Sequence, residues 1–226
     1  FYPLFVQTGL SGDSMLFVYD KSDAKLKHLY TNPRRAYKSL LLRLQTMGIG
    51  SWHDIPGWCD YDNIYQQRVD EAQDGQVFLE IGCAYGKSTA CMAEAIKRSG
   101  KNLTFYAVDF WSMPIFPFQW FVNHLTQLRL LDYVIPLKMR SAQAATFFGD
   151  NSLDFVYIDG SHEYNDVLED LNLWYPKVKP GGWFCGHDYV FDEFPGVTSA
   201  VDHFFAPDDK PSVTINGRSW CTQKPQ

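Results

Sequence analysis

Residues 77–88 read VFLEIGCAYGKS, an apolar run followed by a turn that contains two glycines. The run Val77–Ile81 predicts a buried strand, and Gly82 and Gly86 let the backbone turn tightly and approach a ligand closely. Ser88 can cap the helix that follows. The spacing is neither GxGxxG nor that of a P-loop, because the first glycine lies one residue too near the lysine. The stretch predicts a strand–turn–helix unit with a ligand at the turn, although an ordinary connection would carry the same pattern.

The rest of the chain alternates between apolar strands and amphipathic helices. The expected strands are Leu103–Val108, Val134–Lys138, Leu153–Ile158 and Trp183–Gly186, and the expected helices are Ser88–Ser99, Trp120–Leu131, Ala142–Phe148, Tyr164–Trp174 and Val197–Phe205. Such alternation predicts parallel pairing, with helices on both faces. Ser212–Ile215 and Arg218–Cys221 flank Asn216-Gly217, a pattern typical of an antiparallel hairpin. We therefore predict an α/β fold with a Rossmann-like, mostly parallel seven-stranded sheet and a C-terminal antiparallel hairpin.

Weaker signals precede this alternation. Over residues 1–30, apolar stretches alternate loosely with a stretch of turn-forming residues, which indicates a hairpin or an irregular arm. Asn32-Pro33 is a good helix start, and the leucines after it keep helical spacing. A polar helix is expected over Asp60–Ala72. We predict two parts, an arm with a helical cap at residues 1–74 and the sheet domain at residues 75–226.

The composition is that of a globular protein, with 46% hydrophobic and 20% charged residues. The net charge is −6 and no block of five like charges occurs, so the usual footprint of a nucleic-acid binder is missing. The five cysteines form no CxxC pair, which predicts reduced, mostly buried thiols and a cytoplasmic location. No apolar run approaches the roughly 18 residues of a membrane span. These features favour a small-molecule substrate, with no nucleic acid and no membrane as partner.

Ligands of open parallel sheets bind beyond the carboxyl ends of the strands, so the residues after each strand carry the functional argument. The acid Glu80 beside the glycine turn argues for a cationic ligand and against a phosphate. Asp109, 27 residues after Gly82, can accept bonds from two ribose hydroxyls, or it can cap a turn. Trp111 could stack on an adenine. Ser141 could contact the adenine edge or cap a short helix, and both roles stay open.

Three polar residues follow the two later strands. Asp159 and His162 lie after Leu153–Ile158, and Asp188 follows Trp183–Gly186. An unperturbed imidazole titrates near pH ~6.5, so His162 is a natural general base, unless it only caps a helix and faces solvent. Asp159 and Asp188 follow neighbouring strands, so their carboxylates should lie close together and could hold a hard divalent cation such as Mg²⁺. The alternative is a hydrogen-bonded structural pair, or acids that orient the substrate.

In this order, the motifs resemble those of the class I S-adenosylmethionine-dependent methyltransferases. The matching features are Glu80-x-Gly82-x3-Gly86, Asp109, Asp159-Gly160-Ser161-His162 and Pro180-Gly181-Gly182 followed by Gly186-His187-Asp188-Tyr189. More narrowly, the chain resembles the subgroup of macrolide-sugar O-methyltransferases that includes the mycinamicin and macrocin enzymes. The resemblance covers about residues 75–206. It implies that residues 75–226 bind S-adenosylmethionine.

The resemblance also implies how the cofactor is held. Glu80, Gly82 and Gly86 would hold its methionine part, and Asp109 would hold the ribose. The other residues expected to line the cofactor site are Cys83, Tyr85, Ser88, Trp111, Ser141 and Asp159.

For catalysis, the resemblance implies that His162, with Asp159 beside it, takes the proton from a substrate hydroxyl. Asp159 and Asp188 would bind Mg²⁺. Tyr189 stands where related metal-dependent enzymes of the catechol type place an acid or amide, so the sequence shows no evident third metal ligand.

The expected function is therefore O-methylation of a hydroxyl on a small molecule, such as a sugar or natural product, by a protein that could form a homo-oligomer. One alternative is a hydroxylase-like oxidoreductase on the same fold, although a nicotinamide enzyme would show GxGxxG. Another is a non-catalytic module that only binds the cofactor, against which the set Asp159, His162 and Asp188 argues. A nucleic-acid methyltransferase is disfavoured by the net acidity.

Overall fold

The computed structural model describes residues 2–8, 13–19, 48–112, 118–206 and 210–226. The chain divides into two compact units at the junction of Gly48 and Ile49. In the first unit, β1 (Tyr2–Thr8) and β2 (Asp13–Tyr19) pair as an antiparallel hairpin, one of the two predicted forms of this arm. The helix expected after Asn32-Pro33 lies outside the described residues. The predicted division after residue 74, between an arm and a cofactor domain, stays a prediction.

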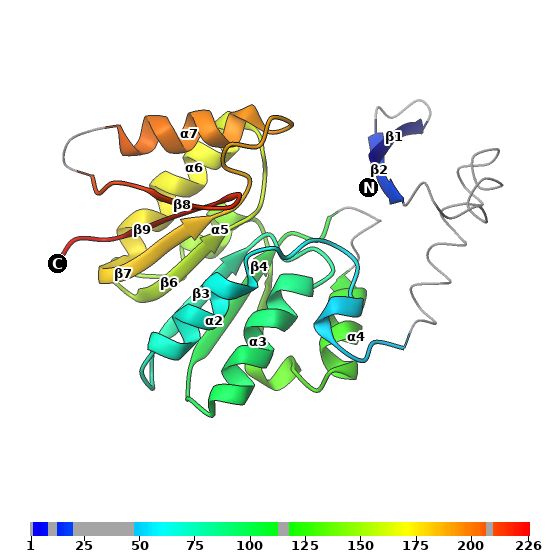
Figure 1. Ribbon diagram of the computed structural model, residues 1–226, viewed down its shortest axis with the longest axis horizontal. Coiled ribbons are helices and arrows are strands. Elements are labelled where there is room, and N and C mark those ends of the chain that lie inside the picture. The colour runs from blue at the N-terminus through cyan, green and yellow to red at the C-terminus, as the bar shows by residue number, and fades with distance from the viewer. Residues whose placement is uncertain (1, 9–12, 20–47, 113–117, 207–209) are drawn as a thin grey trace. The chain divides into compact units, whose positions relative to one another are not determined.

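Seven strands of the second unit form one sheet (Figure 1). In chain order they are β3 (Val77–Ile81), β4 (Thr104–Asp109), β5 (Ile135–Lys138), β6 (Leu153–Ile158), β7 (Val178–Gly186), β8 (Thr214–Asn216) and β9 (Ser219–Gln223). Their order across the sheet is β5-β4-β3-β6-β7-β9-β8. The first five strands are parallel, and β9 runs antiparallel to both β7 and β8. The predicted mostly parallel, seven-stranded sheet with a C-terminal hairpin is confirmed.

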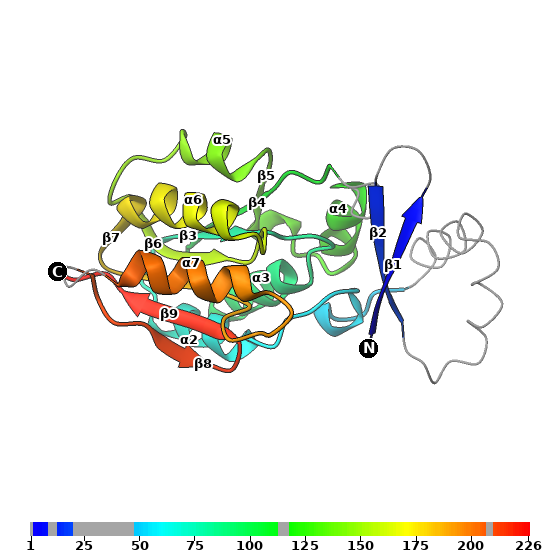
Figure 2. The ribbon, with the colours of Figure 1, turned by 90° about the horizontal axis from the view of Figure 1, so that it is seen from above.

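Helices cover both faces of this sheet, as Figures 1 and 2 show. The α-helices are α2 (Asp62–Glu71), α3 (Lys87–Ser99), α4 (Phe118–Gln127), α5 (Ser141–Ala145), α6 (Tyr164–Trp174) and α7 (Pro195–Phe205). Three-residue 3-10 helices lie at Trp52–Asp54, Leu131–Tyr133 and Tyr175–Lys177. None of the helices in the described part of the chain is long and apolar enough to cross a membrane.

The hydrophobic core forms two layers, one on each face of the sheet. Phe78 and Phe155 belong to the cluster that includes α2, α3 and α4. Their chain neighbours Leu79 and Val156 belong to the cluster that includes α5, α6 and α7. Successive side chains of a strand point to opposite faces, so β3 and β6 contribute to both layers. Because β3 to β7 run parallel, their carboxyl ends lie together at one edge of the sheet.

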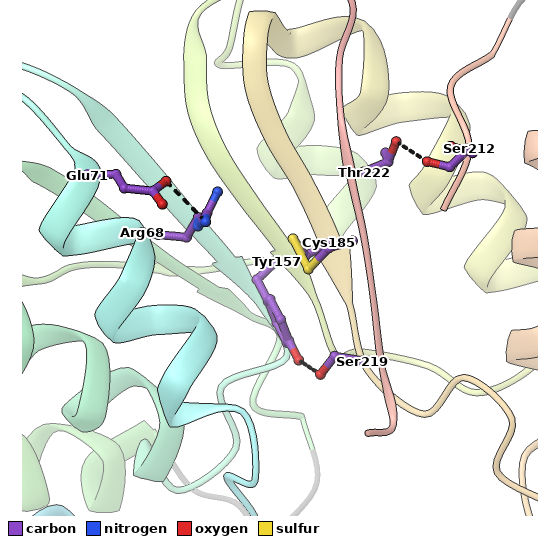
Figure 3. The surroundings of a disulfide bond; sticks show 8 residues. Arg68, Glu71, Tyr157, Cys185, Ser212, Ser219 and Thr222 are labelled. Atoms are coloured by element: carbon purple, nitrogen blue, oxygen red, sulfur yellow. Dashed lines mark hydrogen bonds and ion pairs between the residues drawn. A yellow bond between two sulfur atoms is a disulfide. The ribbon is translucent and has the colours of Figure 1, made fainter. Parts of the chain in front are cut away.

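The prediction that all cysteines are reduced was wrong for one pair. Cys185 in β7 lies directly opposite Cys221 in β9, and the structure joins them by a disulfide (Figure 3). The two residues are 36 positions apart, and only the antiparallel register of β7 and β9 brings them together. Cys59, Cys83 and Cys91 are outside any disulfide.

Candidate functional site

The turn after β3 packs directly against the end of β6. Gly82 has a φ of +88°, and a Cβ atom there would lie 1.9 Å from the backbone oxygen of Asp159. Gly86 has a φ of +87°, and its Cβ would lie 2.9 Å from the ring of Phe121. Glycine has no Cβ and adopts positive φ at little cost, so both positions require it. The two glycines thereby allow the turn to lie at the edge where the sequence predicts a ligand.

Asp109 at the end of β4 holds this turn. Its Oδ2 atom accepts hydrogen bonds from the backbone N–H of Cys83 (2.9 Å) and of Ala84 (2.8 Å). Its Oδ1 atom accepts a third bond, from the N–H of Trp111 at 2.7 Å. The acid and the turn are therefore one hydrogen-bonded unit at the carboxyl ends of β3 and β4.

Glu80 lies fully buried behind the turn. Its carboxylate accepts hydrogen bonds from the hydroxyl of Tyr65 (2.9 Å) and from that of Thr89 (2.5 Å). Burial raises the pKa of Glu80 to about 7, although the hydrogen bonds from Ser88, Thr89 and Tyr65 oppose the shift. These bonds tie β3 to α2 and α3. The geometry gives Glu80 a structural role, and its contact with a cofactor stays a prediction.

Trp111 and Ser141 also make contacts within the protein. The Trp111 indole is 5% exposed, packs against Phe121 and donates its N–H to the backbone oxygen of Ala84 at 2.7 Å. The Ser141 hydroxyl donates to Asp170 (2.5 Å) and accepts from the indole N–H of Trp174 (2.8 Å). Both side chains are thus held by partners other than an adenine, and their contact with one stays a prediction.

The remaining predicted cofactor residues lie around the turn. Ser88 and Cys83 are buried, Ser88 beside Glu80 and Cys83 with its thiol 3.5 Å from the backbone oxygen of Val108. Tyr85 stacks on Trp120, with ring centroids 5.6 Å apart.

Phe110 is a further exposed residue at this edge that was not predicted from the sequence. Its side chain is 41% exposed at the end of β4, and the Arg140 guanidinium lies 4.4 Å from the centre of its ring. An exposed aromatic next to an acid that follows a strand is the signal that could have found it.

Asp159, His162 and Asp188 meet at the ends of β6 and β7, as the sequence predicted. One potential ligand atom of each lies within 4.8 Å of the others. His162 Nε2 is 2.9 Å from Asp188 Oδ2, and its ring stacks on Phe194 with centroids 3.8 Å apart. Asp188 has a φ of +58°, an uncommon value that marks a constrained turn. The three side chains form a compact cluster of two acids and an imidazole.

The pKa values of these acids move in opposite directions. Burial raises the pKa of Asp159, although the charge of His187 opposes the rise. Burial also acts to raise the pKa of Asp188, but hydrogen bonds from His162 and His187 outweigh it and hold that pKa well below its usual value. Asp188 is therefore a carboxylate at neutral pH.

His187 is a site residue that the sequence reasoning missed. Its Nδ1 atom lies 3.2 Å from Asp188 and 3.7 Å from Asp159, and its Nε2 atom lies 2.7 Å from Asp60. Burial acts to lower its pKa, but the hydrogen bond to Asp188 and the nearby carboxylates raise it to about 9. His187 is therefore an imidazolium at neutral pH.

Asp60 and Tyr61 reach this cluster from the segment before α2. The Tyr61 hydroxyl donates to Asp159 Oδ2 at 2.8 Å, and its ring stacks on Tyr157 with centroids 4.4 Å apart. No sequence signal connects these two residues to the ends of β6 and β7, because Asp60 lies 127 positions from His187 and Tyr61 lies 98 positions from Asp159.

Comparison with known proteins points to one enzyme class for this arrangement. Residues 79–189 match the methyltransferase-domain family. The matched segment begins in β3 and ends beside Asp188, so it includes the glycine turn, Asp109 and the cluster of acids and imidazoles.

Two curated relatives of this chain are uncharacterized proteins. One is an uncharacterized protein of Sinorhizobium fredii, 28% identical over 49% of this chain and 13% of its own length. Another is an uncharacterized protein of Acanthamoeba polyphaga mimivirus, 39% identical over 25% of this chain and 26% of its own length. The matches therefore span only 13% and 26% of the lengths of these two relatives.

Solved structures similar to this chain support the fold. The O-methyltransferase NovP has a TM-score of 0.58 and 18% identity, over 73% of this chain and 79% of its own. An O-methyltransferase from Bacillus cereus, solved in complex with SAH, has a TM-score of 0.56 and 15% identity, over 89% and 96% of the two chains. A protein from Clostridium thermocellum described as an rRNA methylase has a TM-score of 0.57 and 16% identity, over 75% and 100%. At these identities the likeness establishes the sheet and its topology.

Proposed function

We propose that this protein is an S-adenosylmethionine-dependent methyltransferase that methylates a hydroxyl of a small molecule. The observation that carries the proposal is the contact of His162 with Asp188, at 2.9 Å, at the edge of the sheet that holds the glycine turn and Asp109. A base oriented by a carboxylate is what removal of a hydroxyl proton requires. The methyltransferase-domain match at residues 79–189 and the O-methyltransferases of similar fold support the same reading.

The residues at this edge fit S-adenosylmethionine better than a phosphate ligand. Lys87 would be the cation of a phosphate site, but its ammonium group donates to the backbone oxygens of His53 and Ile55, each at 2.9 Å. Asp109 and Asp159 instead place two acids beside the turn. We propose that Asp109 and the turn at residues 82–86 hold the ribose and methionine parts of the cofactor, with Phe110 next to the adenine. When bound, S-adenosylmethionine supplies a methyl group on a positively charged sulfur.

In this proposal the chain itself moves the proton. The Nε2 atom of His162 faces Asp188, so this nitrogen carries the hydrogen when the ring is neutral. The other ring nitrogen, Nδ1, then accepts the proton of the substrate hydroxyl. Asp188 keeps the ring in this tautomer and stabilises the imidazolium that forms. The stack of His162 on Phe194 fixes the plane of the ring.

A divalent ion held by Asp159 and Asp188 is a separable part of the proposal. The cluster with His162 has three donor atoms within 4.8 Å of one another, and carboxylate oxygens are ligands that Mg²⁺ prefers. Such an ion would lower the pKa of the substrate hydroxyl and orient it. The position expected for a further ligand is Tyr189, whose hydroxyl donates to Asp202 at 2.5 Å. In this proposal His162 Nε2 carries a hydrogen toward Asp188, so the ion would depend on the two acids alone.

Titration calorimetry with S-adenosylmethionine and S-adenosylhomocysteine, with and without Mg²⁺, tests the cofactor and the ion together. We expect micromolar binding of both compounds. A change in affinity or heat on adding Mg²⁺, lost in Asp188→Asn, supports the ion. Absence of binding under both conditions contradicts the proposed function.

Turnover tests the role of His162. A panel of sugars, phenols and hydroxylated natural products is incubated with methyl-labelled cofactor to find an acceptor. With that acceptor, His162→Ala should lower kcat about 100-fold, because general base catalysis contributes at least this much, while cofactor affinity stays unchanged. His203→Ala is the matched control, since His203 is an exposed histidine on α7. Normal turnover of His162→Ala would show that another group takes the proton.

A further inference from the structure

Four side chains of the candidate site form one alternating chain of carboxylates and imidazoles. Asp60 Oδ1 lies 2.7 Å from Nε2 of His187. The Nδ1 atom of the same ring lies 3.2 Å from Asp188 Oδ1. Asp188 Oδ2 in turn lies 2.9 Å from Nε2 of His162. Both oxygens of Asp188 are thus engaged, each by a different imidazole.

The exposure of the four side chains shows which contacts water can replace. The side chains of His187 and Asp188 are 6% and 7% exposed, whereas those of Asp60 and His162 are 55% and 37% exposed. A buried N–H that loses its acceptor has no water to bond to, which makes such a loss costly. Removal of the Asp60 carboxylate therefore acts first on His187 and, through it, on Asp188.

Tyr61 holds Asp60 at this position. The Tyr61 ring is 1% exposed and lies between Tyr157 and His187, with centroids 4.4 Å and 4.9 Å away. Its hydroxyl donates to Asp159, the acid that also lies 3.7 Å from His187. Because Tyr61 is buried and held by these contacts, the backbone of its neighbour Asp60 is kept beside His187. The segment before α2, which lies outside the matched residues 79–189, is therefore part of the site.

We propose that Asp60 is a positioning residue for His162 and acts through His187 and Asp188. By keeping the His187 ring in place, Asp60 fixes the rotation of the Asp188 carboxylate, and this carboxylate then sets the orientation and tautomer of His162. The catalytic meaning of this arrangement rests on the proposed function, because only a base needs one defined tautomer. The arrangement itself is a property of the folded chain and is measurable without a substrate.

NMR of the histidine rings tests the proposal on the whole chain, with ¹⁵N-labelled histidine and no ligand added. The wild type should show His162 in a single tautomer with hydrogen on Nε2. Asp60→Ala should shift the ring ¹⁵N signals of both His187 and His162 and make His162 a mixture of tautomers. Asp60→Asn keeps an acceptor oxygen and should restore most of the wild-type signals. Asp62→Asn removes an exposed acid two residues away and is the matched control.

The outcomes separate this proposal from the function. The positioning role of Asp60 is overturned if the His162 signals are unchanged in Asp60→Ala. It is also overturned if Asp62→Asn shifts the His162 signals as much as Asp60→Ala does. Calorimetry with S-adenosylmethionine on the same variants serves as the reference, and we expect cofactor affinity equal to that of the wild type. If neither the wild type nor the variants bind the cofactor, but the His162 signals still change in Asp60→Ala, the positioning role stands and the proposed function fails. With an acceptor available, Asp60→Ala should lower kcat about tenfold with little change in KM, as expected for loss of an orienting partner.

Discussion

Gly82 is the residue on which the geometry of the site depends most directly. Replacement by alanine would place a Cβ 1.9 Å from the backbone oxygen of Asp159, at a φ of +88°. We expect Gly82→Ala to lower the free energy of unfolding by at least about 3 kcal/mol, since positive φ alone costs 1–3 kcal/mol and the clash adds to it. Denaturant unfolding followed by tryptophan fluorescence measures this.

Gly100 provides the control for that substitution. It has a φ of +67° at the end of α3, and nothing lies within 4 Å of its Cβ position. Gly100→Ala should cost only about 1 kcal/mol, the penalty of the left-handed conformation alone. Equal losses of unfolding free energy in Gly82→Ala and Gly100→Ala would mean that the close contact of the turn with β6 adds nothing to the cost at Gly82.

Asp170 should make stability depend on pH. Burial raises the pKa of its carboxyl to about 6 from 3.8, although the hydrogen bond from Ser141 opposes the rise. The folded state thus keeps a proton that the unfolded state has lost, so this group favours folding below pH 4 and loses that contribution as the pH rises through 6.

Asp170→Asn removes this dependence and keeps an acceptor for Ser141. Relative to the wild type, the variant should gain about 2–3 kcal/mol between pH 4 and pH 7.5, the equivalent of a shift of two pKa units. Thermal or urea unfolding across this range measures the difference. Asp192→Asn, at an exposed position outside this helix, should show no such gain, and parallel stability curves for Asp170→Asn and the wild type would contradict the prediction.

At the residue scale, the sequence pointed to the two acids and the imidazole of the cluster but not to their partners. Asp159, His162 and Asp188 were predictable because they follow strands whose carboxyl ends meet at one edge. Trp111 and Ser141 show the limit of this reasoning, because position along the chain does not tell whether a side chain faces a ligand or the core. His187, Asp60 and Tyr61 act through contacts that depend on where the segment before α2 lies.

Among the elements, β7 departs most from its prediction. The sequence predicted Trp183–Gly186, whereas β7 begins at Val178 and includes Pro180-Gly181-Gly182. Leu153 pairs with Val178, but Phe155 pairs with Trp183, so β7 has a bulge opposite the start of β6. A bulge leaves residues unpaired, and proline, which has no N–H, is tolerated there. The apolar pattern alone could not show a strand through this sequence.

The disulfide should stabilise the attachment of β9 to β7. Its two cysteines are 36 positions apart, and closing a loop of this length is worth about 4 kcal/mol in the chain-entropy account. We expect the double variant Cys185→Ser, Cys221→Ser to lose about this much stability, measured by denaturant unfolding without reductant. Adding dithiothreitol should lower the stability of the wild type to a similar degree and leave the double variant unchanged. Equal stability of the wild type with and without reductant would refute the prediction.

On the scale of the whole molecule, the unit Ile49–Gln226 should fold by itself. The buried residues of both described core clusters fall between Ile49 and Trp220. We expect a fragment of residues 49–226 to unfold cooperatively, within about 3 °C of the full chain, and to bind S-adenosylmethionine with the same affinity. Calorimetry of the two proteins measures both properties. A fragment that does not fold would show that residues 1–48 contribute to the core.

The overall fold was predictable because its signals are local and repeat. Each predicted strand is an apolar run, each predicted helix has apolar residues at helical spacing, and Asn216-Gly217 marks the final hairpin. The parallel pairing of β3 to β7 follows from the alternation of strands and helices, whereas the order of the strands across the sheet was not predicted. The disulfide was not predictable in this way, because it depends on the register of two antiparallel strands joined through a long connection.

The contacts of Asp60 with His187 and of Tyr61 with Asp159 also constrain the order of assembly. They join positions 127 and 98 residues apart in the sequence, and such distant contacts form late in folding because closing long loops is entropically costly. A chain emerging from the ribosome has made Asp60 and Tyr61 long before it reaches β7. The four-membered chain that ends at His162 therefore exists only after β7 has been synthesised and paired with β6. If the proposed function holds, proton transfer at this site requires the completed fold, and a nascent or partly unfolded chain would be inactive.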